Sequence, residues 1–266
     1  MNKIGIFGDS FGENIRLNDI KDSSSAKLLE YRSWIDLIGT TRSHALGGTD
    51  IQWSFLEFEK HHSKYDQVIF VLTNTNRVTI KDENTNKLFK LVAGTYAGEW
   101  SSDMQKDADD ALKNNNIETH HMCKALMELE KVLLMNNDYQ DRIYLFYNLV
   151  IERIKQIRPD IKFINGTCLI TNQSIGGFHN SSNYPIPSIP LNNSCLQDIT
   201  DYENKIMKWK SVDNQHDTRI GHLTEESHII LASLIKKWLK TDEMFFNFNL
   251  KEFENVKPDI RKYNNG

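Results

Sequence analysis

One run of apolar residues constrains the fold of this chain more than any other feature of its sequence. Residues Val68 to Leu72 are all apolar, and the polar stretch TNTNR follows them directly. A strand with one face in water alternates apolar and polar residues, whereas an unbroken run is typical of a strand covered on both faces. The run therefore predicts a central strand of a parallel sheet.

Strand and helix patterns alternate along the rest of the chain. Further strands are predicted at Ile4–Phe7, at Ser43–Leu46 and within PDIKFING. Helices are predicted in AKLLEYRSWIDLIGT, in DIQWSFLEFEKHH with Trp53, Phe55 and Leu56 facing inward, and in ETHHMCKALMELEKVLLM, YQDRIYLFYNLVIERIKQIR, DYENKIMKWK and LTEESHIILASLIKKWLK. This alternation predicts an α/β fold, a doubly wound parallel sheet with helices on both faces.

The expected organisation is one domain over residues 1–240, followed by a C-terminal extension over residues 241–266. A mostly helical insertion is expected around residues 78–150. Its first part, from Val78 to about Asn116, is polar and without a clear period, so we expect little regular structure there.

Composition and charge exclude several classes of protein. With 26% charged residues and a formal net charge of −4, the chain has no general attraction to nucleic acid or to an anionic membrane. It contains no run of about 18 apolar residues and no signal peptide at its start. Three cysteines without metal-type spacing suggest reduced thiols. We therefore expect a cytoplasmic protein, and the sequence says nothing of its oligomeric state.

Three polar turns stand where a doubly wound sheet binds its ligands, outside the carboxyl ends of the strands, and a fourth polar segment comes late in the chain. Ser10 follows the first strand in Gly8-Asp9-Ser10, Gly47-Gly48 follows the second, and Asn74 and Asn76 follow the third. The fourth is the loop DNQHDTRIGHLTEESH, which leads into the last helix. A serine held up at a strand end is well placed to act as a nucleophile.

Taken together, these four blocks resemble the SGNH/GDSL hydrolases over about residues 3–77 and 160–240. The resemblance implies a flavodoxin-like three-layer αβα sandwich with about five parallel strands. It also implies that Ser10 is the nucleophile and His222, rather than His216, the general base, and that His228 is structural. The oxyanion would then be bound by the N–H groups of Ser10 and Gly48, with Gly47 as the competing glycine.

Two blocks depart from the family pattern. Where a typical member has Gly-x-Asn-Asp, this chain has Thr73-Asn74-Thr75-Asn76, which puts Thr75 at the position of the oxyanion asparagine. A slip of one residue would give this role to Asn74, the favoured candidate, or to Asn76. Arg219 stands where the family has the aspartate three residues before the histidine. Asp217 is the expected partner of the imidazole, with Asp213 or a backbone carbonyl as alternatives.

The function that the resemblance implies is hydrolysis of an ester through an acyl-enzyme, without a cofactor. A small acyl group on a carbohydrate suits the polar loops, and TNTNR and HLTEESHIILASLI look like SGNH-type proteins carried by bacteriophages, which would place the protein on a virion. The substrate-binding residues would be Asp9, Thr75, His179 and Tyr184. Alternatives are a non-catalytic binding protein on an SGNH scaffold and an intracellular lysophospholipase or thioesterase.

Metal binding is not expected from the adjacent histidines of the sequence. His61-His62 and His120-His121 are neighbouring pairs, and on a helix such side chains point about 100° apart. They are therefore poor chelators.

Overall fold

The centre of the fold is a parallel sheet. The computed structural model describes residues 2–14, 32–73, 77–81, 88–92, 97–134, 137–166, 194–207 and 223–256. Strands β1 (Ile4–Gly8), β2 (Arg42–Ser43), β3 (Gln67–Leu72) and β6 (Lys162–Asn165) pair in parallel in the order β2-β1-β3-β6. The predicted α/β class is confirmed, with the apolar run in β3 between two neighbours.

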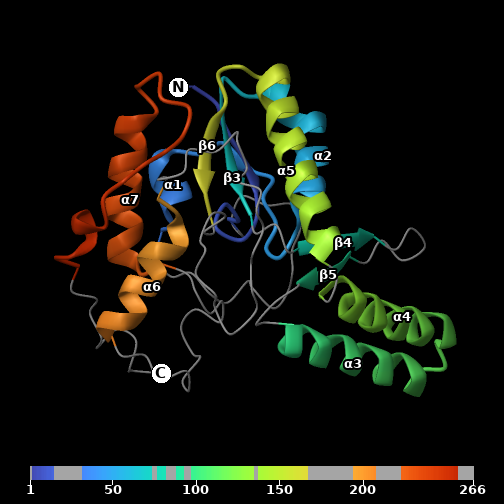
Figure 1. The fold of residues 1–266 in the computed structure, drawn as a ribbon. Coiled ribbons are helices and arrows are strands. Elements are labelled where there is room, and N and C mark those ends of the chain that lie inside the picture. The colour runs from blue at the N-terminus through green and yellow to red at the C-terminus, as the bar shows by residue number, and fades with distance from the viewer. Residues whose placement is uncertain are drawn as a thin grey trace.

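Helices cover both faces of this sheet, so the fold has three layers (Figure 1). One layer holds α1 (Trp34–Ile38), α6 (Leu196–Met207) and α7 (Glu225–Trp238), and the other holds α2 (Ile51–His61) and α5 (Asn137–Ile157). Side chains of β3 alternate between the two layers: Ile69 and Val71 join the first core, whereas Val68, Phe70 and Leu72 join the second. This division explains why the strand has no polar face.

On the second face, α2 presents a different stripe from the one predicted. Its buried residues are Ile51, Ser54 and Phe58, and Leu56 is 45% exposed. The prediction that Leu56 faces inward is therefore wrong. Asp50 caps the helix, since its carboxylate accepts a hydrogen bond from the Trp53 N–H at 2.7 Å.

Helix α1 is shorter than predicted because Ser33 is its N-cap. The Ser33 hydroxyl accepts from the Asp36 N–H, and the Asp36 carboxylate accepts from the Ser33 N–H, a capping box that begins the helix at Trp34. At this end the Trp34 N–H donates to Nδ1 of His228 on α7, 3.1 Å away. His228 is only 6% exposed, so it joins the two helices within the core.

This contact makes His228 a test of the α1–α7 interface. Replacing His228 with leucine should lower the free energy of unfolding by about 1–3 kcal/mol, because the buried Trp34 N–H loses its acceptor. His228→Asn keeps an acceptor near the position of Nδ1 and should lose less. Urea unfolding of both variants measures the difference, and a leucine variant as stable as the asparagine variant would contradict this role.

The inserted region is more regular than its composition suggests. Strands β4 (Arg77–Lys81) and β5 (Leu88–Val92) pair antiparallel, and α3 (Ala97–Lys113) and α4 (Ile117–Leu134) follow. Figure 1 shows α3 and α4 side by side below α5. Ala108 of α3 and Cys123 and Leu126 of α4 form a small core with Val78 and Ile80 of β4. The expectation of little regular structure from Val78 to Asn116 is wrong, because this core needs few apolar residues.

Two isolated parallel bridges, Phe163–Phe245 and Asn165–Cys195, stand at the free side of β6, where the fifth strand is expected. Phe163 pairs in parallel with Phe245: its N–H donates to the Met244 carbonyl, and its carbonyl accepts from the Phe246 N–H, each at 2.8 Å. Residues 244–246 thus stand where a fifth strand would lie, and Phe246 and Phe253 are buried in the first core.

The cysteines differ from the prediction of reduced thiols. Cys195, which directly precedes α6, is disulfide-bonded, and Cys123 on α4 is free. The number and spacing of cysteines could not reveal this, because a disulfide depends on which thiols the fold brings together. Among the residues described above, no helix is both long and apolar enough to cross a membrane.

Candidate active site

Ser10 lies in the turn after β1, at the carboxyl edge of the sheet. Gly8 ends the strand with φ of 132°, and a Cβ there would lie 2.2 Å from the carbonyl oxygen of Val71, so only glycine fits. The Gly12 N–H then closes the turn by donating to the Asp9 carbonyl at 2.9 Å. Ser10 itself is half-buried. The structure therefore places the predicted nucleophile at a strand end, as the sequence suggested.

The Gly47-Gly48 turn lies directly against this serine. The Leu46 N–H donates to the Gly8 carbonyl at 3.1 Å, which brings the end of β2 beside the end of β1. A Cβ on Gly47 would lie 3.3 Å from the Ser10 Cβ, so a side chain at this position would crowd the nucleophile. Gly48 is buried with φ of 77°, a left-handed conformation that favours glycine. Both glycines thus remain candidates for the oxyanion N–H.

Asp9, the residue before the nucleophile, is held by a buried network. Its side chain is 0% exposed. Oδ1 accepts a hydrogen bond from the Phe11 N–H at 3.1 Å, and Oδ2 accepts from the Thr73 hydroxyl at 2.9 Å. Oδ2 also accepts from the guanidinium of Arg77, the first residue of β4, at 3.1 Å. We predicted Asp9 as a substrate-binding residue, and these contacts favour a role in positioning the turn.

Burial and the neighbouring donors have opposite effects on the pKa of Asp9. Burial raises the pKa of Asp9, while Arg77 and the Thr73 hydroxyl lower it, and the effect of burial is the larger. The Arg77 side chain is itself only 16% exposed. Removing one partner of such a buried ion pair leaves the other charge buried without compensation, which destabilises the folded state.

The third block is anchored at its first residue. Thr73 is buried, and its carbonyl accepts a hydrogen bond from the Tyr147 hydroxyl of α5 at 2.6 Å. Its hydroxyl binds Asp9, so the chain leaving β3 is tied to the nucleophile turn. The predicted oxyanion and substrate residues Asn74, Thr75 and Asn76 lie outside the described residues.

The fourth block is described only from Leu223 onward. Thr224 caps α7 by accepting from the Ser227 N–H, and the Glu203 carboxylate accepts from both the Thr224 N–H and its hydroxyl. Glu203 is 3% exposed, and burial raises its pKa. The predicted base His222, its partner Asp217 and the loop residues His179 and Tyr184 lie outside the described residues.

The turn after β6 also lies at this edge of the sheet, close to Asp9. A Cβ on Gly166 would lie 3.3 Å from the Asp9 Oδ1, so the turn after β6 also approaches the network around Asp9. The structure therefore brings together the exits of β1, β2, β3 and β6. The sequence predicted a strand and a polar or glycine turn at all four places, but it did not predict Arg77 and Glu203, whose roles have no signal in local spacing.

Comparisons with known proteins add no relative. No family model matches the chain, and neither the curated proteins nor the solved structures gave a match.

Proposed function

We propose that this protein is a serine hydrolase that cleaves carboxylic esters, with Ser10 as its nucleophile. The observation that carries the proposal is the meeting of the Ser10 turn with the Gly47-Gly48 turn at the carboxyl edge of the sheet. In a doubly wound fold this edge is where ligands bind.

The proposed mechanism is acyl transfer in two steps. The Ser10 Oγ attacks the acyl carbonyl carbon while His222 accepts the hydroxyl proton. His222 then donates this proton to the oxygen of the leaving alcohol as the ester bond breaks. A water molecule, deprotonated by His222, attacks the acyl carbon, and His222 returns the proton to the Ser10 Oγ as the bond between Oγ and the acyl group breaks and the acid leaves. In this proposal Asp217 orients the imidazole.

Stabilisation of the tetrahedral intermediate would come mainly from fixed donors. The N–H groups of Ser10 and Gly48 and the amide of Asn74 or Asn76 are the proposed oxyanion donors. Asp9 supports this arrangement indirectly, because its carboxylate ties the Ser10 turn to Thr73 and Arg77. Such positioning matters because an oxyanion hole works only when its donors are already in place.

The substrate proposed first is an acetylated carbohydrate, with a host surface polysaccharide as its natural form if the protein is virion-associated. Support comes from the polar residues of the predicted substrate loop and from the resemblance to phage-borne SGNH proteins. A small acyl group needs no extended apolar cap.

A fluorophosphonate probe tests the nucleophile directly. The probe should label one serine, and peptide mapping should place the label on Ser10, because only an activated hydroxyl reacts with such reagents. Ser10→Ala should abolish labelling. Ser63→Ala removes an exposed serine before β3 and should leave labelling unchanged.

Two results would contradict the proposal. Labelling that persists in a folded Ser10→Ala protein would place the nucleophile elsewhere. Absence of labelling in the folded wild type would favour a non-catalytic binding protein.

A further inference from the structure

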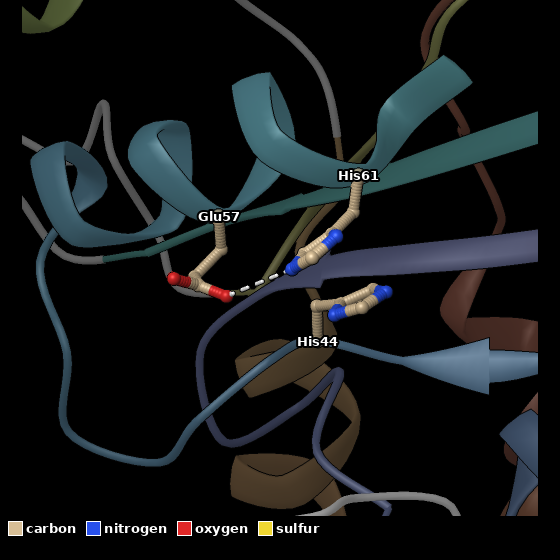
Figure 2. A group of neighbouring side chains, drawn as sticks. All are labelled: His44, Glu57 and His61. Carbon is tan, nitrogen blue, oxygen red and sulfur yellow. Dashed lines mark ion pairs between the residues drawn. The ribbon is translucent and has the colours of Figure 1, made fainter. Parts of the chain in front are cut away.

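A second group of ligand-binding side chains lies beside β2, built from different residues than the Ser10 turn. His44 directly follows β2, and Glu57 and His61 stand one turn apart on α2. One donor atom from each residue, a ring nitrogen or a carboxylate oxygen, lies within 4.8 Å of the other two. Figure 2 shows Glu57 and His61 pointing from the helix toward His44 on the neighbouring segment. All three side chains are partly buried.

The outer nitrogen of each histidine is already hydrogen-bonded. His44 Nε2 contacts the Tyr65 hydroxyl at 2.7 Å, and His61 Nδ1 contacts the Lys64 ammonium at 3.0 Å. These contacts leave His44 Nδ1 and His61 Nε2 as the nitrogens for a shared ligand. A metal-binding histidine usually donates the N–H of its second ring nitrogen to an acceptor, a role that the Tyr65 hydroxyl can fill for His44. The Lys64 ammonium can only donate, so it must leave Nδ1 before His61 can bind a metal through Nε2. Lys64 is exposed, so its ammonium can turn to solvent when Nδ1 of His61 carries the proton.

The carboxylate is oriented in the same manner. Glu57 Oε1 accepts a hydrogen bond from the Lys60 ammonium at 2.7 Å, while Oε2 lies 3.7 Å from His61 Nε2. One oxygen is therefore occupied from outside the cluster, and the other faces the histidines. Glu57 also supplies the negative charge that a cation at this place would need.

The surroundings of the cluster combine partial burial with nearby positive charges. Burial, with the charges of His61 and Arg42, lowers the pKa of His44 to about 4. Burial and Lys64 also lower the pKa of His61. The positive charges of three nearby side chains, Arg42, Lys60 and Lys64, repel a metal cation. The expected affinity for the metal is therefore weaker than that of a structural site with four protein ligands.

We infer that His44, Glu57 and His61 bind a divalent transition-metal ion, with zinc as the best match. Two imidazoles and one carboxylate are a known donor set for zinc, and they leave the fourth tetrahedral position for water. The two rings are now stacked, with centroids 4.4 Å apart and planes at 15°. Coordination at about 2.0–2.2 Å requires the rings to leave this stack, so that both nitrogens point at one ion. The ion would join β2 to the C-terminal half of α2, independently of any hydrolase activity.

Isothermal titration of the full-length protein with Zn²⁺ tests this site. The wild type should bind one equivalent, and His44→Gln and His61→Gln should each weaken binding more than about 100-fold. Tyr65→Phe removes only the orienting hydrogen bond and should weaken binding by about 10-fold. His62→Gln is the matched control, since His62 neighbours the site in sequence but stacks on Phe58 with centroids 4.7 Å apart. Its affinity should equal that of the wild type.

Co²⁺ tests the coordination geometry of the site, and Mg²⁺ tests its selectivity. Co²⁺ should give the visible absorption of a tetrahedral site in the wild type and lose it in Glu57→Gln, while Mg²⁺ should not displace it. Far-UV circular dichroism confirms that each variant is folded. Ser10→Ala should bind Zn²⁺ like the wild type, which separates this inference from the proposed function. No binding by the wild type, or equal binding by folded His44→Gln and His61→Gln variants, would overturn it.

Discussion

Ser10→Ala should lower the turnover of p-nitrophenyl acetate by roughly 10³–10⁶-fold. The expected loss is large because, in the acyl-enzyme route, the serine supplies the oxygen that forms the bond to the acyl group. The structure places Ser10 at the end of β1 against Gly47, and the substitution removes only one oxygen from a half-buried side chain. The fold should therefore persist. Steady-state kinetics on the purified protein measure the effect.

A double variant tests whether Ser10 and His222 act together. His222→Ala should lose about as much turnover as Ser10→Ala, and the combined variant should lose little more, because a nucleophile and its base act as a unit. His216→Ala is the matched control and should retain turnover. Equal activity of the His222→Ala variant and the wild type would remove His222 from the mechanism, and unchanged activity in Ser10→Ala would remove the mechanism itself.

The second large effect concerns the buried ion pair. Arg77→Met should lower the free energy of unfolding by about 3–5 kcal/mol at pH 8, because it leaves the Asp9 carboxylate buried without its cation. Arg142→Met, at an exposed position of α5, should change it by less than about 0.5 kcal/mol. Guanidinium unfolding at pH 5 and pH 8 measures both variants.

The sign of the pH dependence follows from the Asp9 carboxyl. Its folded-state pKa is raised by burial and should rise further without Arg77. In the window between its unfolded and folded pKa values, the folded state then binds more protons than the unfolded state. The free energy of unfolding therefore falls as pH rises through that window. The deficit of Arg77→Met should be smaller at pH 5 than at pH 8, and adding Asp9→Asn should remove the difference. An equal deficit at both pH values would contradict this account.

Much of the fold could be predicted because its signals are local. Short sequence patterns predict three of its elements: β3 from its apolar run, β1 from the apolar residues before Gly8, and α7 from its helical spacing. The hairpin β4–β5 and α3 could not be predicted in this way, because their small core is assembled from a few apolar residues far apart in sequence. The prediction for Leu56 was wrong because an apolar residue in a helix need not face the core.

The candidate site was predictable to the same degree. Ser10 and the Gly47-Gly48 turn could be placed together because parallel strands end at one edge of their sheet. Arg77 could not be foreseen as the partner of Asp9, because 68 residues separate them. The adjacent pairs His61-His62 and His120-His121 do not predict the cluster of His44, Glu57 and His61, because His44 comes from another segment of the chain.

The short outer strands of the sheet have a consequence for association between molecules. An open strand edge is a template on which a second chain can pair, and long exposed edges lead to aggregation. At one edge, β2 contributes only two residues, Arg42 and Ser43. At the other, the N–H and carbonyl of Phe163 are already bonded to the Met244–Phe246 segment. Within the described part of the sheet, both edges are thus poor templates, which protects the chain against edge-to-edge polymerisation.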